Sequence, residues 1–182
     1  YHNNRGYNLH LTVKTLNEER TSGQVDFAGR QPSDSLFGVF IKTDRVESWM
    51  KNAFVFSEQT NLGIATGYIY HNQHSFFGRR KYDGAQHSYN ANLIFNHVFD
   101  DEERHSVHAG ISSQGDFVDE KIAFNDTDKY KFSIDDLSFG AFGQYTYKYD
   151  DVFTVILGIR GDYNNNYKFF VETNDSLNLI SI

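Results

Sequence analysis

Residues 139–163 read FGAFGQYTYKYDDVFTVILGIRGDY, and this stretch decides the fold class. Apolar and polar residues alternate on both sides of one short acidic step, Asp150-Asp151. Because successive side chains of a strand point to opposite faces, alternation of period two predicts two paired strands with one apolar and one polar face. The open question is whether the apolar face meets a dry core or lipid.

The composition favours sheets with one apolar face over a bundle of helices. Hydrophobic residues make up 39% of the 182 residues, yet aromatic residues reach 16%, with 17 Phe and 12 Tyr. The mean hydropathy is -0.58. No run of apolar residues is long enough for a membrane-spanning helix. The net charge of -7 argues against a nucleic-acid partner, and the absence of Cys excludes disulfides, thiolate metal sites and a cysteine nucleophile.

Alternation along the rest of the chain predicts an all-β antiparallel up-and-down meander of about seven strands. A bulge is expected in the second strand, where the alternation is poor. Long polar connections alternate with short turns, as in outer-membrane barrels; soluble sandwiches are less regular. The predicted strands are 7–16, 39–56, 61–73, 87–99, 105–118 and the two strands of the quoted hairpin; the long connections are 22–38, 74–86 and 119–135, and the short ones are 57–61, 100–104 and 150–151.

The order of residues along the apolar faces favours lipid over a dry core. In the last strand of the hairpin, Phe153 and Tyr163 flank the aliphatic Val155, Leu157 and Ile159. An apolar band between two aromatic girdles is typical of the lipid-facing side of a barrel. The opposite face suits a wet lumen, with Phe142 and Ile156 as exceptions; its polar members are Ser138, Gln144, Thr146, Lys148, Thr154, Arg160 and Asp162. A soluble antiparallel sheet with its apolar face packed inward is the alternative.

Two stretches resemble TonB-dependent outer-membrane receptors of the Bacteroidetes type. The hairpin FGAFGQYTYKYDDVFTVILGIRGDYNN (139–165) is similar to barrel hairpins of that family, and SFFGRRKYDGAQHSYNANLIFNHVF (75–99) is similar to its S-Y-F-G-R-R-x-Y-D-G…ANLIF segment. RTSGQ (20–24) and 41–56 fit less tightly, and the resemblance covers about 7–170.

The resemblance implies that residues 1–182 are a partial barrel domain, about a third of a 22-stranded barrel. It implies a location in the outer membrane, an N-terminal plug domain, an energy-coupling partner of the TonB type, and uptake of a scarce nutrient: a siderophore, haem, cobalamin or a glycan. In the family, the lumen-facing Arg160 and Asp162 would contact the plug. The chain departs from the family pattern after Phe170, so we expect a truncated piece, and the resemblance leaves open whether residues 171–182 belong to the barrel.

The titratable clusters predict no catalytic or metal site, and we expect no enzyme and no cofactor. His71 and His74, and likewise His105 and His108, are three residues apart and point to opposite faces of a strand. The acidic groups 100–103 and 150–151 are expected to be solvated turn residues. The oxygen-rich segment 125–128 is a weak calcium candidate, because it lacks the glycine and spaced glutamate of a dedicated loop.

The predicted external loop 74–86 is the best candidate for ligand binding. Its basic and aromatic side chains suit an anionic, partly apolar ligand such as a metal chelate. Binding of lipopolysaccharide phosphates, or bracing of the loop itself, is the alternative. The candidate ligand-binding residues are His74, Phe77, Arg79, Arg80, Tyr82 and Asp83.

A self-contained small β-barrel binding protein, lipocalin-like or an eight-stranded outer-membrane barrel, is the rival interpretation. A lipocalin-like barrel requires Leu93, Leu157 and Ile159 to line a closed interior and Arg160 to face water. A receptor barrel requires the reverse.

Overall fold

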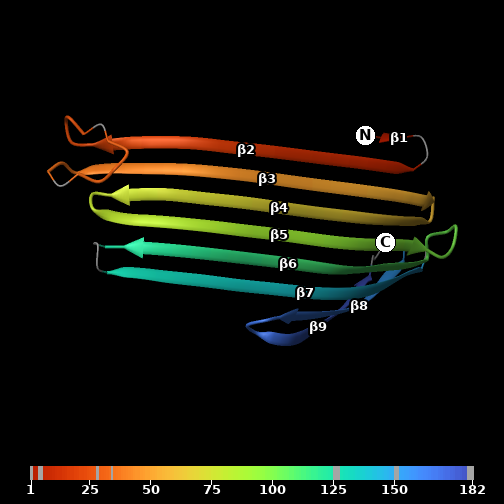
Figure 1. Cartoon of the computed structure of the whole chain (residues 1–182). Coiled ribbons are helices and arrows are strands. Elements are labelled where there is room, and N and C mark those ends of the chain that lie inside the picture. Colours follow the sequence, from red (N-terminus) through yellow and green to blue (C-terminus); the bar gives the residue numbers. More distant parts are fainter. Residues whose placement is uncertain are drawn as a thin grey trace.

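The computed structural model describes residues 2–3, 6–27, 29–33, 35–124, 128–149 and 152–179, with side chains from residue 6 to residue 173 of these ranges. The described residues form nine strands in one antiparallel sheet, in sequence order (Figure 1). None of them lies in a helix with the length and apolarity needed to cross a membrane. The strands are β1 His2–Asn3, β2 Tyr7–Gly23, β3 Gly38–Ser57, β4 Thr60–Phe77, β5 Arg80–Val98, β6 His105–Ala123, β7 Lys129–Tyr149, β8 Phe153–Asn164 and β9 Lys168–Leu179.

The predicted meander is confirmed, and the strand number is corrected from seven to nine. One addition is the two-residue β1. The other is β9, which pairs with β8 from Lys168 opposite Asn164 to Leu179 opposite Phe153. Residues 171–179, whose place in the barrel the sequence leaves open, therefore continue the sheet. In the described part of the chain β2 and β9 do not pair with each other, so the sheet is open.

Two of the three predicted long loops are strand. β4 and β5 are joined only by Gly78-Arg79, where Gly78 has a φ of 61° that favours glycine, and β6 and β7 are paired up to Ala123 opposite Lys129. Among the connections between the described strands, only the one from β2 to β3 is long. The many charged and polar residues of 74–86 and 119–135 are the reason why the sequence predicts loops there. Strand pairing needs only backbone hydrogen bonds, which polar residues make equally well.

The long strands exceed what a bilayer requires. β2 to β7 have 17 to 21 residues each, whereas a tilted strand crosses the hydrocarbon core in about 9–11 residues. About half of each long strand therefore extends beyond the membrane in a barrel of this kind. The bulge expected in the second strand lies at its end, where the register of β3 against β4 shifts between Val55 and Ser57; the pairs from Val39 to Val55 are continuous.

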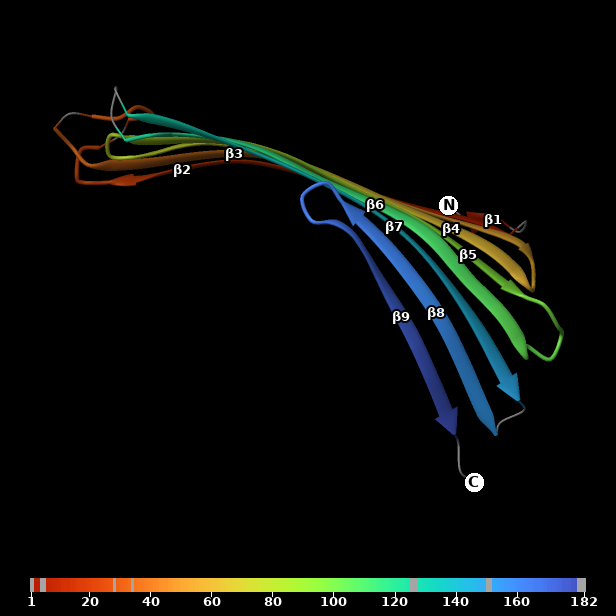
Figure 2. The ribbon, with the colours of Figure 1, turned by 90° about the horizontal axis from the view of Figure 1, so that it is seen from below.

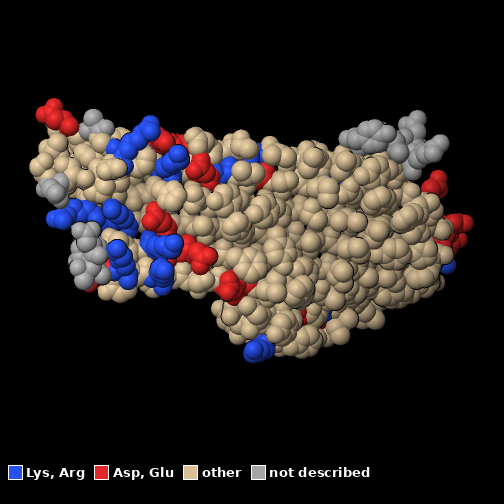
Figure 3. Space-filling model, viewed as in Figure 1, with Lys and Arg blue, Asp and Glu red and all other residues tan. Residues whose placement is uncertain are grey.

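Directly opposed residues share a face, so the register divides the sheet into two faces. The face that carries Leu11, Leu93 and Leu157 is here called the outer face, and the opposite one, with Ser88 and Arg160, the inner face. The predicted faces of β7 and β8 are confirmed, including Phe142 and Ile156 on the inner face. In Figure 3, charged side chains gather at the end where β4 meets β5, and a wide adjoining area of the sheet is nearly free of them.

The sheet has almost no dry core. Among the described residues only two apolar side chains are buried, Phe40 and Phe76, which stack on each other and are joined by Phe27 at the end of the long strands. By contrast, Leu11 is 60% and Ile159 59% exposed on the outer face. A soluble sheet would bury such residues, so this pattern matches an apolar face made for lipid.

The sheet is curved, and β8 and β9 turn away from the plane of the other strands (Figure 2). β8 is also shorter: it ends at Asn164 opposite Ser138, so residues 129–137 of β7 have no strand partner on that side. Just after the end of β8, the side chain of Asn165 hydrogen-bonds to the backbone of β7 in place of a strand partner. Asn165 Oδ1 accepts a hydrogen bond from the Leu137 amide at 3.0 Å, and its Nδ2 donates to the Asp135 carbonyl at 2.9 Å.

Candidate functional site

The six predicted ligand-binding residues lie on both faces of the sheet. His74 and Asp83 are directly opposed on the outer face, where His74 Nδ1 and Asp83 Oδ1 are 2.7 Å apart. Phe77, Arg80 and Tyr82 lie on the inner face, and Arg79 is in the turn. The hairpin does not bring the six together, because neighbouring residues of a strand point in opposite directions.

The three inner-face residues join a cluster that the sequence did not predict. The Arg80 guanidinium lies 5.6 Å from the centre of the Phe124 ring, and Phe124 packs edge-on against Tyr130 at 5.9 Å. Phe77 is directly opposite Arg80 in the hairpin. We call the set of Phe77, Arg80, Tyr82, Glu120, Phe124 and Tyr130 the inner rim cluster.

Tyr82 is the most constrained member of the inner rim cluster. Its hydroxyl donates a hydrogen bond of 2.7 Å to Glu120 Oε1. Partial burial, then this hydrogen bond and the charge of Glu120, raise the pKa of Tyr82 to about 12. The ring lies over Gly84, where a Cβ atom would come within 2.6 Å of the Tyr82 hydroxyl oxygen. Glycine at this position therefore leaves the room that the Tyr82 ring occupies.

The inner rim cluster combines one cation, one carboxylate and several aromatic rings on an exposed surface. Phe77, Phe124 and Tyr130 are each about half exposed. Aromatic rings with a guanidinium bind planar or partly apolar anionic groups. The arrangement therefore suits binding of such a group.

Arg160 and Asp162, the predicted plug contact, lie next to each other on the inner face of β8. Their side chains form a two-pronged ion pair, with Arg160 Nε 2.7 Å from Asp162 Oδ2 and Nη2 2.6 Å from Oδ1. The pair lies over Gly140 of β7, where a Cβ atom would meet the Asp162 carboxylate. Contact with a plug stays a prediction.

The histidine and acidic clusters of the sequence lie partly within the described residues. In the described part of the chain, no group of three His, Asp or Glu side chains converges as metal ligands would. The turn at Asp100–Arg104 follows the sequence prediction, with Glu103 at a φ of 53°. The acidic step 150–151 and residues 125–127 of the calcium candidate lie outside the described residues.

Sequence positions alone could not have predicted Glu120, Phe124 and Tyr130, because all three fall in the stretch expected to be a loop. A usable signal was present in the hairpin itself. Gly78-Arg79 as a two-residue turn would have paired Phe77 with Arg80 and placed Tyr82 on their face.

Comparisons with known proteins agree on the fold. No family model matches the sequence, and no curated protein matches it. Among solved structures, "The crystal structure of the ferric yersiniabactin uptake receptor FyuA from Yersinia pestis" aligns over 96% of this chain and 31% of that chain, with a TM-score of 0.56 and 13% identity. "Structure of the RagAB peptide transporter" aligns over 74% and 19%, with a TM-score of 0.54 and 10% identity.

The two alignments cover 96% and 74% of this chain, so the chain spans less than a third of the length of either solved protein. At these identities the likeness concerns the fold alone. The chain therefore shares the fold of part of each of these two proteins, in keeping with the all-β meander that the resemblance of its hairpins implied.

Proposed function

We propose that the chain is part of the barrel wall of a TonB-dependent receptor in the outer membrane and that this receptor takes up a scarce nutrient. The observation that carries the proposal is the difference between the two faces. The outer face leaves apolar residues such as Leu11 and Ile159 exposed along the middle of the strands, where polar residues predominate on the inner face. A wall with lipid on one side and water on the other needs this arrangement.

Energy coupling would reach the wall through partners outside this chain. A plug domain would close the lumen and engage the TonB-type coupling protein. The Arg160–Asp162 pair is a suitable contact for a plug, because its charged atoms lie on the inner face and Arg160 is still 43% exposed. The role proposed for the chain is structural and ligand-binding, not enzymatic.

The inner rim cluster would give the incoming nutrient its first contact with this section of the wall. The half-exposed rings of Phe124 and Tyr130, together with Arg80, suit an anionic ligand with an apolar body. A ferric siderophore or haem fits this description better than a neutral glycan, and cobalamin is intermediate.

Uptake by cells that carry the full-length protein tests the proposal. Accumulation of a ferric siderophore, haem, cobalamin and an oligosaccharide is measured with and without an active coupling protein. We expect at least one ligand to accumulate only when coupling is active. Arg80→Gln should weaken its binding, whereas Arg20→Gln, on the inner face of β2, should not. Equal accumulation of every ligand in coupled and uncoupled cells would refute the proposed function.

A further inference from the structure

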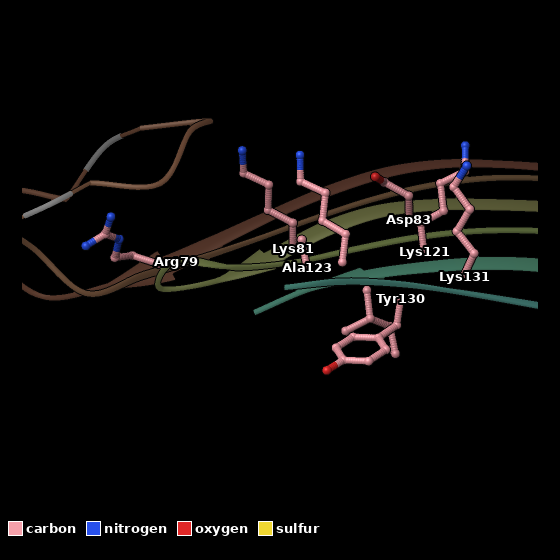
Figure 4. Close-up of a pocket in the computed structure, with 9 residues that line it drawn as sticks. Arg79, Lys81, Asp83, Lys121, Ala123, Tyr130 and Lys131 are labelled. Atoms are coloured by element: carbon pink, nitrogen blue, oxygen red, sulfur yellow. The ribbon is translucent and has the colours of Figure 1, made fainter. Parts of the chain in front are cut away.

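Four lysines lie together on the outer face, at the end where the long strands leave the membrane. Lys81 is on β5, Lys121 on β6, and Lys129 and Lys131 on β7, and all four side chains are exposed. The register places them in two adjoining rows, with Lys121 opposite Lys131 and Ala123 opposite both Lys81 and Lys129. In Figure 4, Lys81, Lys121 and Lys131 stand on one side of the ribbon and Tyr130 on the other. We call these four residues the lysine cluster.

The charges of the lysine cluster are not balanced within the protein. Lys121 is directly opposite Asp83 on one side, but the Asp83 carboxylate is held by His74 Nδ1 at 2.7 Å. On its other side Lys121 faces Lys131, and like charges in directly opposed positions destabilise a sheet. Within the described residues none of the four lysines forms an ion pair.

The lysine cluster borders a shallow cavity that is suited to an anion. The cavity has a volume of about 280 Å³. Five basic side chains and a single carboxylate line it, although the whole chain carries a net charge of -7. Its basic residues are Arg79 and the lysine cluster, and the carboxylate is that of Asp83. Asp119 lies one outer-face position from Lys121 on β6, and Asp135 two such positions from Lys131 on β7; with Asp83, three carboxylates stand against five basic side chains.

The height of Lys121 and of Lys131 opposite it matches the surface of a bilayer, and Lys81 and Lys129 lie one outer-face position further out, opposite Ala123. Tyr68, Tyr89 and Phe117 form the aromatic end of the apolar band on the outer face, where Tyr89 stacks on Phe117. Lys121 is four residues beyond Phe117, which is ~13 Å along the strand and ~10 Å along the membrane normal for a tilt of ~40°. Headgroups occupy ~5–8 Å on each side of the hydrocarbon core, and a lysine stem reaches back toward them.

We propose that Lys81, Lys121, Lys129 and Lys131 bind the phosphate groups of lipid headgroups in the leaflet from which the long strands emerge. The lysine cluster lies on the face that carries the lipid-contacting residues, and phosphate supplies the negative charge that the Lys121–Lys131 pair lacks. The proposal rests on the proposed function only in taking the outer face as the lipid-facing one. It does not depend on transport or on the nutrient.

Native mass spectrometry of the full-length protein in detergent can test this binding. The protein is titrated with lipid A, which carries phosphates, and with dephosphorylated lipid A. The test variant is Lys121→Gln with Lys131→Gln. The matched control is Lys14→Gln with Lys51→Gln, which removes two lysines from the inner face. We expect the test variant to bind lipid A roughly 10-fold or more weakly, because each lysine near a phosphate surface contributes to binding. The control should bind as the wild type does, and the dephosphorylated lipid should bind the wild type weakly.

Two results would overturn the proposal. One is equal binding of lipid A by the test variant and the wild type. The other is displacement of lipid A by inorganic phosphate at low concentration, which would identify a site for a soluble phosphate compound. Uptake of the nutrient is measured separately, so failure of lipid binding does not imply failure of the proposed function.

Discussion

A lysine introduced at Leu157 should destabilise the protein far more than one introduced at its neighbour Ile156. Leu157 is 52% exposed on the outer face, and Ile156 lies on the inner face of the same strand. Phe153 and Tyr163 mark the two ends of the outer-face band on β8. The ten steps between them span ~33 Å along the strand, or ~25 Å across the membrane at a tilt of ~40°. Leu157 is one residue from the middle of this span.

A lysine near the middle of the lipid-facing band costs about 2–4 kcal/mol, which is a roughly 30- to 700-fold change in the folding equilibrium. We expect this loss for Leu157→Lys and less than about 1 kcal/mol for Ile156→Lys. Tyr163→Lys, at the end of the band, should also cost less than about 1 kcal/mol. The free energy of unfolding is measured by urea titration of the full-length protein in phospholipid vesicles, with Trp49 fluorescence as the signal.

Equal losses for Leu157→Lys and Ile156→Lys would refute the assignment of the two faces. A loss at Tyr163 as large as that at Leu157 would refute the dependence on membrane depth, and with it the lipid-facing interpretation of the outer face. In a soluble sheet the loss follows packing against the core and has no reason to fall off toward the ends of a band of this height.

Two further predictions concern the inner rim cluster. In a spectrophotometric pH titration, Tyr82 should ionise about 2 pH units above the ordinary tyrosines and appear as a late component of the absorbance change. Tyr82→Phe should remove this late component. Glu120→Gln should shift it toward lower pH, because the charge of Glu120 no longer raises the pKa of Tyr82. Its folded-state pKa is above its unfolded value, so the stabilisation is complete below pH ~10 and is lost as the pH rises toward 12. Gly84→Ala should also abolish the late component, since its Cβ would displace the Tyr82 ring from Glu120, with a loss of roughly 1 kcal/mol in urea unfolding. A late component that survives in Tyr82→Phe, or in Gly84→Ala, would contradict the respective assignment.

The faces of the strands could be predicted from the sequence because lipid and water impose opposite chemistry on alternate residues. Tyr7, Leu11 and Val13 on β2, and Leu157 and Ile159 on β8, all lie where the alternation put them. Even the exceptions Phe142 and Ile156 kept their predicted face. A strand in the bilayer leaves little freedom in this pattern, since a slip of one residue would reverse every side chain.

The ends of the long strands beyond the apolar band could not be predicted in the same way. On the outer face there, charged residues such as Asp119 and Lys121 replace the apolar ones, and the apolar residues Phe132 and Ile134 of β7 lie on the inner face, while the backbone pairing continues. The candidate ligand-binding residues divide between the two faces for a related reason: once 74–86 is strand, His74 and Tyr82 point in opposite directions. The lysine cluster was partly visible in the sequence as Lys81, but its β6 and β7 members join it only through the register.

The short β8 has a consequence for how solutes approach. Residues 129–137 of β7 rise above the end of β8, a step of ~30 Å measured along the strand. The sheet therefore has a step at the boundary between β7 and β8, with the long β7 on one side and the short β8 and β9 on the other. In the receptor proposed above, such a step would leave the inner surface of β7 open from the side of β8, next to Asn164 and Asn165.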